Sequence, residues 1–298
     1  MLFDRSSSLD ELTEGKRHRL HQLPSHLTIE VHVHGGCEDV TDGSRAPSHD
    51  SFNRLLLRTP QDTGALWSEA EPMVNKNAGE LVLDDTTLDK PYFQKIALVT
   101  NHWSGKHHRV VRGINLITPL WADVEKPVST DLRVHDKPFR GKNENEHFMD
   151  MLLEARRRDI NPDYVIFDSW YASLDNLELI GTIDSRWLAR LRENRLVSTD
   201  GCQYRAASEI EIPEQGMTAD LKGYGAAKPF RTIRKDGEVR YWAMDGLSMD
   251  AKKRDELESM GWGIEVYHRG IKQRCGIDRE GPREGRMPRG RTSSSACR

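Results

Sequence analysis

Two apolar segments of this chain each end in an aspartate, and this pattern constrains the fold more than any other feature. Asp84 follows the apolar run at residues 81–83, and Asp168 follows the run at residues 164–167. Short apolar runs of this kind predict buried strands. A carboxylate at the carboxyl end of a buried parallel strand points into the crevice where open α/β sheets bind ligands. The pattern therefore favours an α/β sheet with an acidic site at one edge.

A third acid lies in a helical region near the end of the chain. Two helical pieces are predicted, at residues 249–260 and 262–275, on either side of Gly261. Spacings of three and four residues give them one buried apolar stripe, which consists of Leu257, Met260, Ile264, Tyr267 and Ile271. An acid and three potential cations share a neighbouring face of the helix: Glu265, His268, Arg269 and Lys272. A glutamate on a helix beside the sheet can complete the acidic site.

The order of the predicted elements is three strands, a helix, a strand and a helix. Strands are expected at residues 80–86, 94–100, 110–120 and 164–167, with a turn at 101–106. Helices are expected at 143–158 and 175–183, followed by a strand or a pair of strands at 187–191 and 195–198. A three-stranded meander followed by a helical crossover is the layout of the ribonuclease H-like fold. Other α/β sheets share this pattern.

These elements divide the chain into regions. We expect an atypical or poorly ordered region at residues 1–47, a helical segment at 48–78, a ribonuclease H-like domain at 79–198 and 249–275, a β-rich insertion at 199–248, and a disordered tail at 276–298. The insertion is rich in glycine and charge, and its clearest strand is at residues 239–244. The tail is rich in Arg, Gly and Ser and lacks periodicity, which is typical of disorder.

Composition limits how the chain can attract its partners. The net charge is −3 over 298 residues, so no global positive charge draws the protein to nucleic acid. The chain is 36% hydrophobic and 31% charged, which predicts an ordered core with exposed or irregular appendages. Any contact with DNA must therefore come from local basic patches.

Cysteine usage and the amino terminus bear on the compartment. None of the 4 cysteines forms a C-x-x-C pair, so neither a cysteine zinc site nor a disulfide framework is predicted. The chain shows no signal-peptide core and no apolar run long enough to cross a membrane. We therefore expect a cytoplasmic, nucleoid-associated protein with reduced cysteines and no membrane partner.

Three converging carboxylates would hold hard divalent cations through oxygen, which favours Mg²⁺ or Mn²⁺ over zinc. Two such ions about 4 Å apart can activate a nucleophile and stabilise a leaving oxygen in phosphodiester cleavage. Each acid also has a purely structural interpretation. Asp84 and Asp85 could form a turn after a strand, Asp168 could cap the next segment, and Glu265 could form a surface ion pair with Arg269.

Two basic stretches are candidate phosphate contacts, although most such clusters are ordinary solvated surfaces. The first comprises Lys106, His107, His108, Arg109 and Arg112, and the second comprises Lys126, Arg133, Lys137, Arg140 and Lys142. Trp103 and Trp170 lie near the predicted site. They could stack on a displaced base, but burial against the sheet is the preferred interpretation for both.

Four segments together resemble the insertion-sequence DDE transposases of bacteria and archaea. Residues 83–91 (LDDTTLDKP) are similar to the first-aspartate segment, and residues 102–108 (HWSGKHH) and 113–116 (GINL) to the strands that follow it. Residues 165–173 (VIFDSWYAS) resemble the second-aspartate motif, and residues 262–273 (WGIEVYHRGIKQ) resemble the glutamate helix. The likeness runs from about residue 48 to 277.

The resemblance implies a ribonuclease H-like mixed sheet flanked by helices, with a β-rich insertion before the final catalytic helix. It implies Asp84, Asp168 and Glu265 as catalytic acids and ligands of two Mg²⁺ or Mn²⁺ ions, with Asp85 as the alternative first acid. Lys272 matches a lysine of the family signature that contacts DNA. Arg269, His268, Lys106, Arg109 and Arg112 are further candidate DNA contacts. The expected partners are double-stranded DNA at transposon ends and target DNA, with a homodimer as the active form.

The sequence also departs from the family pattern. Glu258 and Gly261 stand where the signature has a tyrosine and an arginine, and both ends of the chain differ from those of relatives. These departures leave two alternatives open. The chain could be an inactive, DNA-binding remnant from a truncated or frameshifted copy, or another ribonuclease H-like nuclease such as a resolvase.

Overall fold

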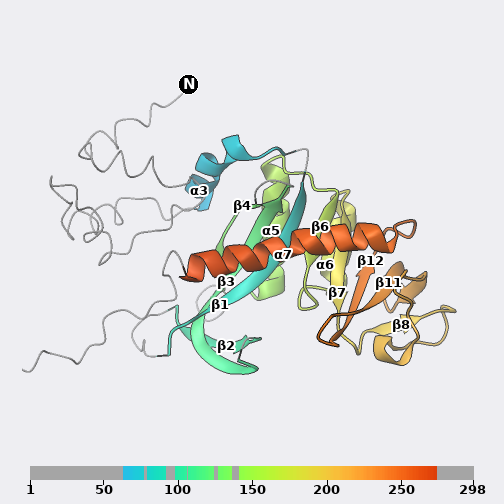
Figure 1. Ribbon diagram of the computed structural model, residues 1–298. Coiled ribbons are helices and arrows are strands. Elements are labelled where there is room, and N and C mark those ends of the chain that lie inside the picture. Colours follow the sequence, from blue (N-terminus) through green and yellow to red (C-terminus); the bar gives the residue numbers. More distant parts are fainter. Residues whose placement is uncertain are drawn as a thin grey trace, which may run out of the picture.

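A mixed sheet forms the centre of the protein, with helices on both of its faces (Figure 1). The computed structural model describes residues 63–76, 79–91, 98–105, 107–123, 127–135 and 141–273. The predictions made for residues 1–47, for a helix start at about residue 48 and for the 276–298 tail lie outside these residues. Within the predicted helical segment at 48–78, the structure has α3 (Thr63–Ala70) and the 3-10 helix η3 (Glu71–Met73).

The central sheet is mixed, as predicted, but its first three strands do not pair one after the other as in the predicted meander, because the third strand lies between the first and the second. Five of its strands are β1 (Glu80–Asp89), β2 (Thr100–Ser104), β3 (Arg109–Ala122), β6 (Tyr164–Phe167) and β7 (Arg186–Leu191). They lie in the order β2-β3-β1-β6-β7. The β3 strand is antiparallel to both β1 and β2, whereas β6 is parallel to both β1 and β7. A parallel neighbour requires a crossover, which α5 (Glu144–Arg157) supplies between β3 and β6.

The region predicted as a β-rich insertion continues this same sheet. The β12 strand (Val239–Met244) has the predicted bounds and pairs antiparallel with β7. Beyond it the sheet continues through β11 (Gly225–Ile233), β10 (Ala219–Leu221), β8 (Leu196–Ser198) and β9 (Arg205–Ala206). Two short strands, β4 (Pro127–Ser129) and β5 (Arg133–His135), pair with β3. A short 3-10 helix, η4 (Ala207–Glu209), follows β9.

Alternation along the strands separates two apolar layers. Leu81 and Leu83 pack with Phe148 on the face covered by α5 and α6 (Leu174–Thr182). Val82 and Ile166 pack on the opposite face, which α7 (Ala251–Gln273) covers. Figure 1 shows α7 crossing the sheet from β3 toward β12. None of the helices in the described residues is both long and apolar enough to span a bilayer.

Local sequence explains why the predicted helices begin where they do. Asn143 caps α5 by accepting a hydrogen bond from the Glu146 backbone N–H at 3.0 Å, while the Glu146 carboxylate accepts one from the Asn143 N–H at 2.6 Å. This reciprocal capping box satisfies two backbone donors at the helix start. Ser173 caps α6 through the Asn176 N–H at 3.3 Å.

The predicted break at Gly261 is wrong, because α7 runs without interruption from Ala251 to Gln273. Glycine lowers helix propensity by about 1 kcal/mol relative to alanine, which is too little to end a helix whose apolar stripe packs on a sheet. A Cβ at Gly261 would lie 3.3 Å from Cγ2 of Ile166. The glycine therefore marks a close approach between α7 and β6.

The predicted second strand and its turn are also misplaced. The β2 strand covers Thr100–Ser104, most of which was predicted as a turn, and residues 92–97 lie outside the described part of the chain. Its side chains are polar or aromatic, and only His102 and Ser104 are buried. An edge strand of this composition lacks the apolar alternation on which strand prediction depends.

Candidate functional site

The pairing of β1 with β6 places Asp84 beside Asp168. These parallel strands pair Leu83 with Phe167, so the next residue of each strand is an aspartate. Asp84 has the same parity as Val82, which packs beneath α7. The Asp84 side chain therefore lies on the α7 face of the sheet.

Glu265 joins this pair from α7. Ile264 is buried against the sheet, and the adjacent Glu265 is exposed at the flank of the helix. The pKa of Asp84 lies well above its usual range, because burial disfavours the charged carboxylate and because Asp85, Asp168 and Glu265 repel it. The structure therefore brings Asp168 and Glu265 each within electrostatic reach of Asp84.

The structural interpretations of the two aspartates have different outcomes. Asp84 and Asp85 do not form a turn, because β1 continues to Asp89. Asp168 does cap a turn, since its Oδ1 accepts a hydrogen bond from the Trp170 N–H at 2.6 Å. That contact holds the carboxylate rigidly at the end of β6 and uses one of its two oxygens. The ion pairs found among the described residues do not include Glu265 with Arg269.

Asp85, the alternative first acid, lies on the other face of the sheet. Its Oδ1 accepts a hydrogen bond from the Tyr171 hydroxyl at 3.2 Å. Burial and the nearby Glu144 carboxylate raise the pKa of Asp85 to about 6. Asp85 therefore belongs to the layer beneath α5, whereas Asp84 shares the α7 face with Glu265.

The predicted basic residues are spread over two elements. Arg109 and Arg112 are exposed on β3, Arg269 is exposed on α7, and Lys272 is half-buried in the last turn of α7. Lys106 lies outside the described residues. His268 is buried, and burial together with the neighbouring Lys272 lowers its pKa to about 3. In this conformation His268 is a neutral ring that adds no positive charge to the surface.

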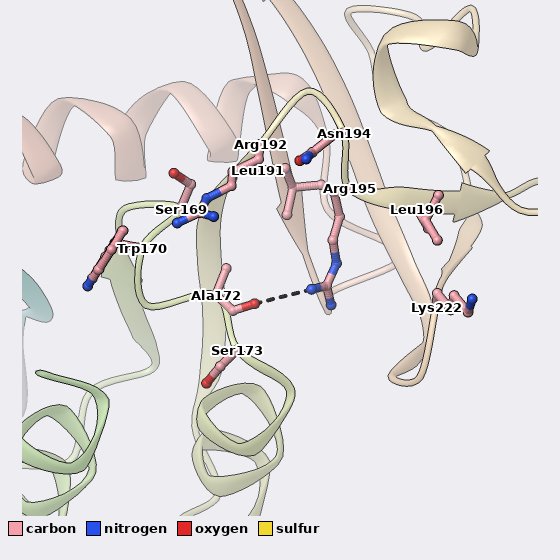
Figure 2. Close-up of a pocket in the computed structure, with 10 residues that line it drawn as sticks. All are labelled: Ser169, Trp170, Ala172, Ser173, Leu191, Arg192, Asn194, Arg195, Leu196 and Lys222. Atoms are coloured by element: carbon pink, nitrogen blue, oxygen red, sulfur yellow. Dashed lines mark hydrogen bonds between the residues drawn. The ribbon is translucent and has the colours of Figure 1, made fainter. Parts of the chain in front are cut away.

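A pocket that the sequence did not reveal adjoins Asp168 (Figure 2). Its volume is about 420 Å³, and its lining includes the cations Arg192, Arg195 and Lys222. Figure 2 shows Nη1 of Arg195 donating to the carbonyl oxygen of Ala172, at 3.4 Å. The buried Nε and Nη2 of Arg195 have no hydrogen-bond partner within the described residues. A guanidinium with unpaired donors in a pocket is suited to bind an anion.

Only part of this pocket could have been found from sequence. The segment from Arg190 to Arg195 carries three arginines around the end of a predicted strand, which is a usable signal. Lys222 reaches the pocket only because the β8 and β10 strands pair, which nothing local in the sequence predicts.

The preferred burial of the two tryptophans is wrong. Trp103 is 61% exposed on the edge strand β2, and Trp170 is 48% exposed beside the pocket. The Trp170 ring lies 5.2 Å from the Arg192 guanidinium carbon, a cation–π contact. Both rings are therefore available for stacking.

Comparison with known proteins identifies the family. Residues 38–209 match the family described as DDE superfamily endonuclease, and this match covers more than half of the chain. The protein therefore belongs to the DDE superfamily of endonucleases, which confirms the family predicted from the motifs. The matched region contains Asp84 and Asp168, while Glu265 lies beyond it.

The solved structures that resemble this chain include a transposase complex. The cryo-EM structure of the piggyBac transposase synaptic complex with hairpin DNA matches with a TM-score of 0.45 at 10% sequence identity. The match covers 76% of this chain and 51% of that chain, so this protein spans about half the length of that transposase. No curated protein sequence matches the chain.

Proposed function

We propose that this DDE superfamily endonuclease is a DNA transposase that nicks insertion-sequence ends and joins them to target DNA. One observation carries the proposal: the β1–β6 register sets Asp84 beside Asp168 on the face that α7 covers, and Glu265 of α7 contributes to the raised pKa of Asp84. Two aspartates that directly follow the parallel-paired residues of β1 and β6, together with a glutamate on the covering helix, suit metal-dependent phosphoryl transfer.

The donor set of this site fits Mg²⁺ or Mn²⁺. All three side chains offer carboxylate oxygens, which hard divalent cations prefer. The crowding that raises the pKa of Asp84 is relieved when a cation neutralises the group. Two bound ions supply Lewis-acid stabilisation of the phosphoryl group and of the attacking and leaving oxygens. Asp84 and Asp168 would hold them from strands, and Glu265 would complete the site from α7.

The surroundings of the acids favour DNA as the substrate. The pocket beside Asp168 presents the Arg195 guanidinium, two of whose three nitrogens have no partner within the described residues, with Arg192 and Lys222 nearby. Such groups bind the phosphates of a DNA strand that passes the acids. Arg109, Arg112, Arg269 and Lys272 extend the proposed contacts to transposon-end and target DNA, and the active form is proposed to be a homodimer.

The test is Mg²⁺-dependent cleavage of DNA that carries the terminal repeats of the element. Asp84→Asn, Asp168→Asn and Glu265→Gln are each expected to reduce cleavage by about 1000-fold or more, because each removes a charged metal ligand. Glu256→Gln is the matched control, since Glu256 is an exposed acid of the same helix whose carboxylate lies 4.0 Å from Nζ of Lys252. Its cleavage rate should equal that of the wild type.

The outcome also separates the alternative functions. Specific binding to the terminal repeats without cleavage would identify an inactive remnant. Cleavage without joining to a target plasmid would identify another ribonuclease H-like nuclease. Full activity of the Asp84→Asn and Asp168→Asn proteins would remove both aspartates from the mechanism.

A further inference from the structure

A second cluster of potential metal ligands lies on the opposite face of the sheet from Asp84. It consists of His102 on β2, His135 on β5 and Glu144 in the first turn of α5, and one ligand atom from each lies within 4.8 Å of the others. The pairing of Asn115 with His135 places His135 on the same face of the sheet as Asp85. The cluster is therefore distinct from the acids beneath α7.

The two histidines are buried, but their rings are only partly satisfied. Nδ1 of His135 lies 2.8 Å from Oε1 of Glu144. Nε2 of His135 is buried without any hydrogen-bond partner in the described residues. A buried, unpaired ring nitrogen is unfavourable unless a ligand fills its coordination. This orphaned nitrogen is an observation independent of the clustering.

The surroundings orient the ligands. Nε2 of His102 lies 2.6 Å from the Thr100 hydroxyl, which leaves the other ring nitrogen for a ligand. Contacts of this kind fix the ring orientation of metal-bound histidines. Glu144 is the first residue of α5 and lies between Asn143 and Glu146, which form the capping box. The Glu144 side chain is 21% exposed, so an ion can reach the cluster from solvent.

We propose that His102, His135 and Glu144 bind one divalent transition-metal ion of the zinc type. Two imidazoles and one carboxylate suit Zn²⁺, and they leave a fourth position for water. The same donor set disfavours Mg²⁺, which prefers oxygen ligands in octahedral geometry. The ion ties the edge strand β2 and the short strand β5 to the start of α5. This proposal does not depend on the transposase assignment.

The test is Zn²⁺ binding to the full chain after chelator treatment, measured by calorimetry in excess Mg²⁺. The wild type is expected to bind one tight equivalent and to gain thermal stability, because the ion binds only the folded cluster. His135→Asn and Glu144→Gln should both lose the tight equivalent and the gain in melting temperature. His107→Asn is the matched control, since His107 is an exposed histidine between β2 and β3 that contacts Asp89 at 2.9 Å.

Two further variants separate this site from other zinc-binding groups. Histidines elsewhere, such as His18 and His34, remain in every variant, so the difference from wild type isolates the cluster. Asp84→Asn with Asp168→Asn should keep the tight equivalent, because those acids lie on the other face. Retention of tight Zn²⁺ by His135→Asn, or its loss from the aspartate double variant, would overturn the proposal.

A spectroscopic probe covers the case in which His135→Asn fails to fold. Co²⁺ bound to the wild type should show the visible absorption of a four-coordinate site. His135→Cys should retain binding and add a thiolate charge-transfer band, because cysteine also ligates such metals. A six-coordinate Co²⁺ spectrum in the wild type, or no thiolate band in a folded His135→Cys protein, would contradict the assignment.

Discussion

At the scale of single residues, the protein concentrates buried carboxyl groups along β1. Asp84, Asp85 and Glu80 all lie on this strand, and each has a pKa above its ordinary value, with burial as the largest cause. Asp84 lies on the face of the sheet with the proposed Mg²⁺ site, and Asp85 lies on the face with the proposed Zn²⁺ site. Glu80 lies at the start of the strand. A group whose pKa differs between the folded and unfolded states makes the free energy of unfolding depend on pH.

Glu80 makes the clearest case for this dependence. Burial raises its pKa to about 7 from 4.5, although its carboxylate accepts the Tyr164 N–H at 2.6 Å. A raised folded-state pKa means that the folded state retains the proton over a pH range in which the unfolded chain loses it. The free energy of unfolding should therefore fall as the pH rises from about 4.5 to about 7.

We predict that Glu80→Gln removes part of this fall, on the order of 2 kcal/mol, because glutamine keeps the acceptor without the charge. Urea denaturation across this pH range, with a chelator present, measures it. Asp236→Asn is the control, as Asp236 lies in an exposed turn. An unchanged pH profile in Glu80→Gln would show that other groups, such as Asp84 and Asp85, account for the dependence.

At the scale of elements, α7 carries Glu265 across the sheet on a single uninterrupted axis. Its glycines differ in how closely they approach other elements. A Cβ at Gly261 would lie 3.3 Å from Ile166, whereas one at Gly263 would meet only ordinary contacts at 3.9 Å, to Leu120 and Pro127. The helix therefore approaches the sheet more closely at Gly261 than at Gly263.

We predict that Gly263→Ala raises the free energy of unfolding by about 1 kcal/mol, because alanine has the higher helix propensity and the space is open. Gly261→Ala should gain less or lose stability, since Ile166 must shift. Urea denaturation of the two variants measures the difference. A larger gain at Gly261 than at Gly263 would contradict the observed approach between α7 and β6.

At the scale of the whole molecule, the net charge of −3 leaves DNA binding to local positive groups. The pocket beside Asp168 supplies Arg195 and Lys222 at the edge of the sheet where the acids lie. The sheet itself continues from β7 into β12 and β11, so the segment that carries Lys222 is joined by strand pairing to the strands that carry Asp84 and Asp168. A single continuous sheet thus places the cations and the acids together.

We predict that replacing both cations, Arg195→Gln with Lys222→Gln, weakens DNA binding. The slope of log K against the logarithm of the salt concentration should become shallower by about 1 to 2. Fluorescence anisotropy at several salt concentrations measures this slope. Arg157→Gln is the control. Arg157 pairs with Glu154 at 2.8 Å near the end of α5. The chain then enters the first residue of β6, whereas Asp168 follows the last residue of that strand. An equal loss in the control would mean that the cations act only through net charge.

Local patterns in the sequence predicted several of the elements and supplied the candidate acids. The apolar run before Asp168 predicted β6 residue for residue, and the helix predicted at residues 143–158 corresponds to α5. Short-range hydrophobic periodicity and capping are properties of neighbouring residues, so they can be seen in one dimension. The order of these elements also predicted the mixed sheet.

Tertiary structure alone decided which groups meet. Asp84 and Asp85 are adjacent in sequence, yet the pleat of β1 places them on opposite faces of the sheet. The packing of α7 on one face and of α5 on the other decides which surroundings each aspartate has. The Lys222 pocket and the His102–His135–Glu144 cluster each join residues that strand pairing brings together. Such contacts depend on register and on packing between distant segments, which no local pattern encodes.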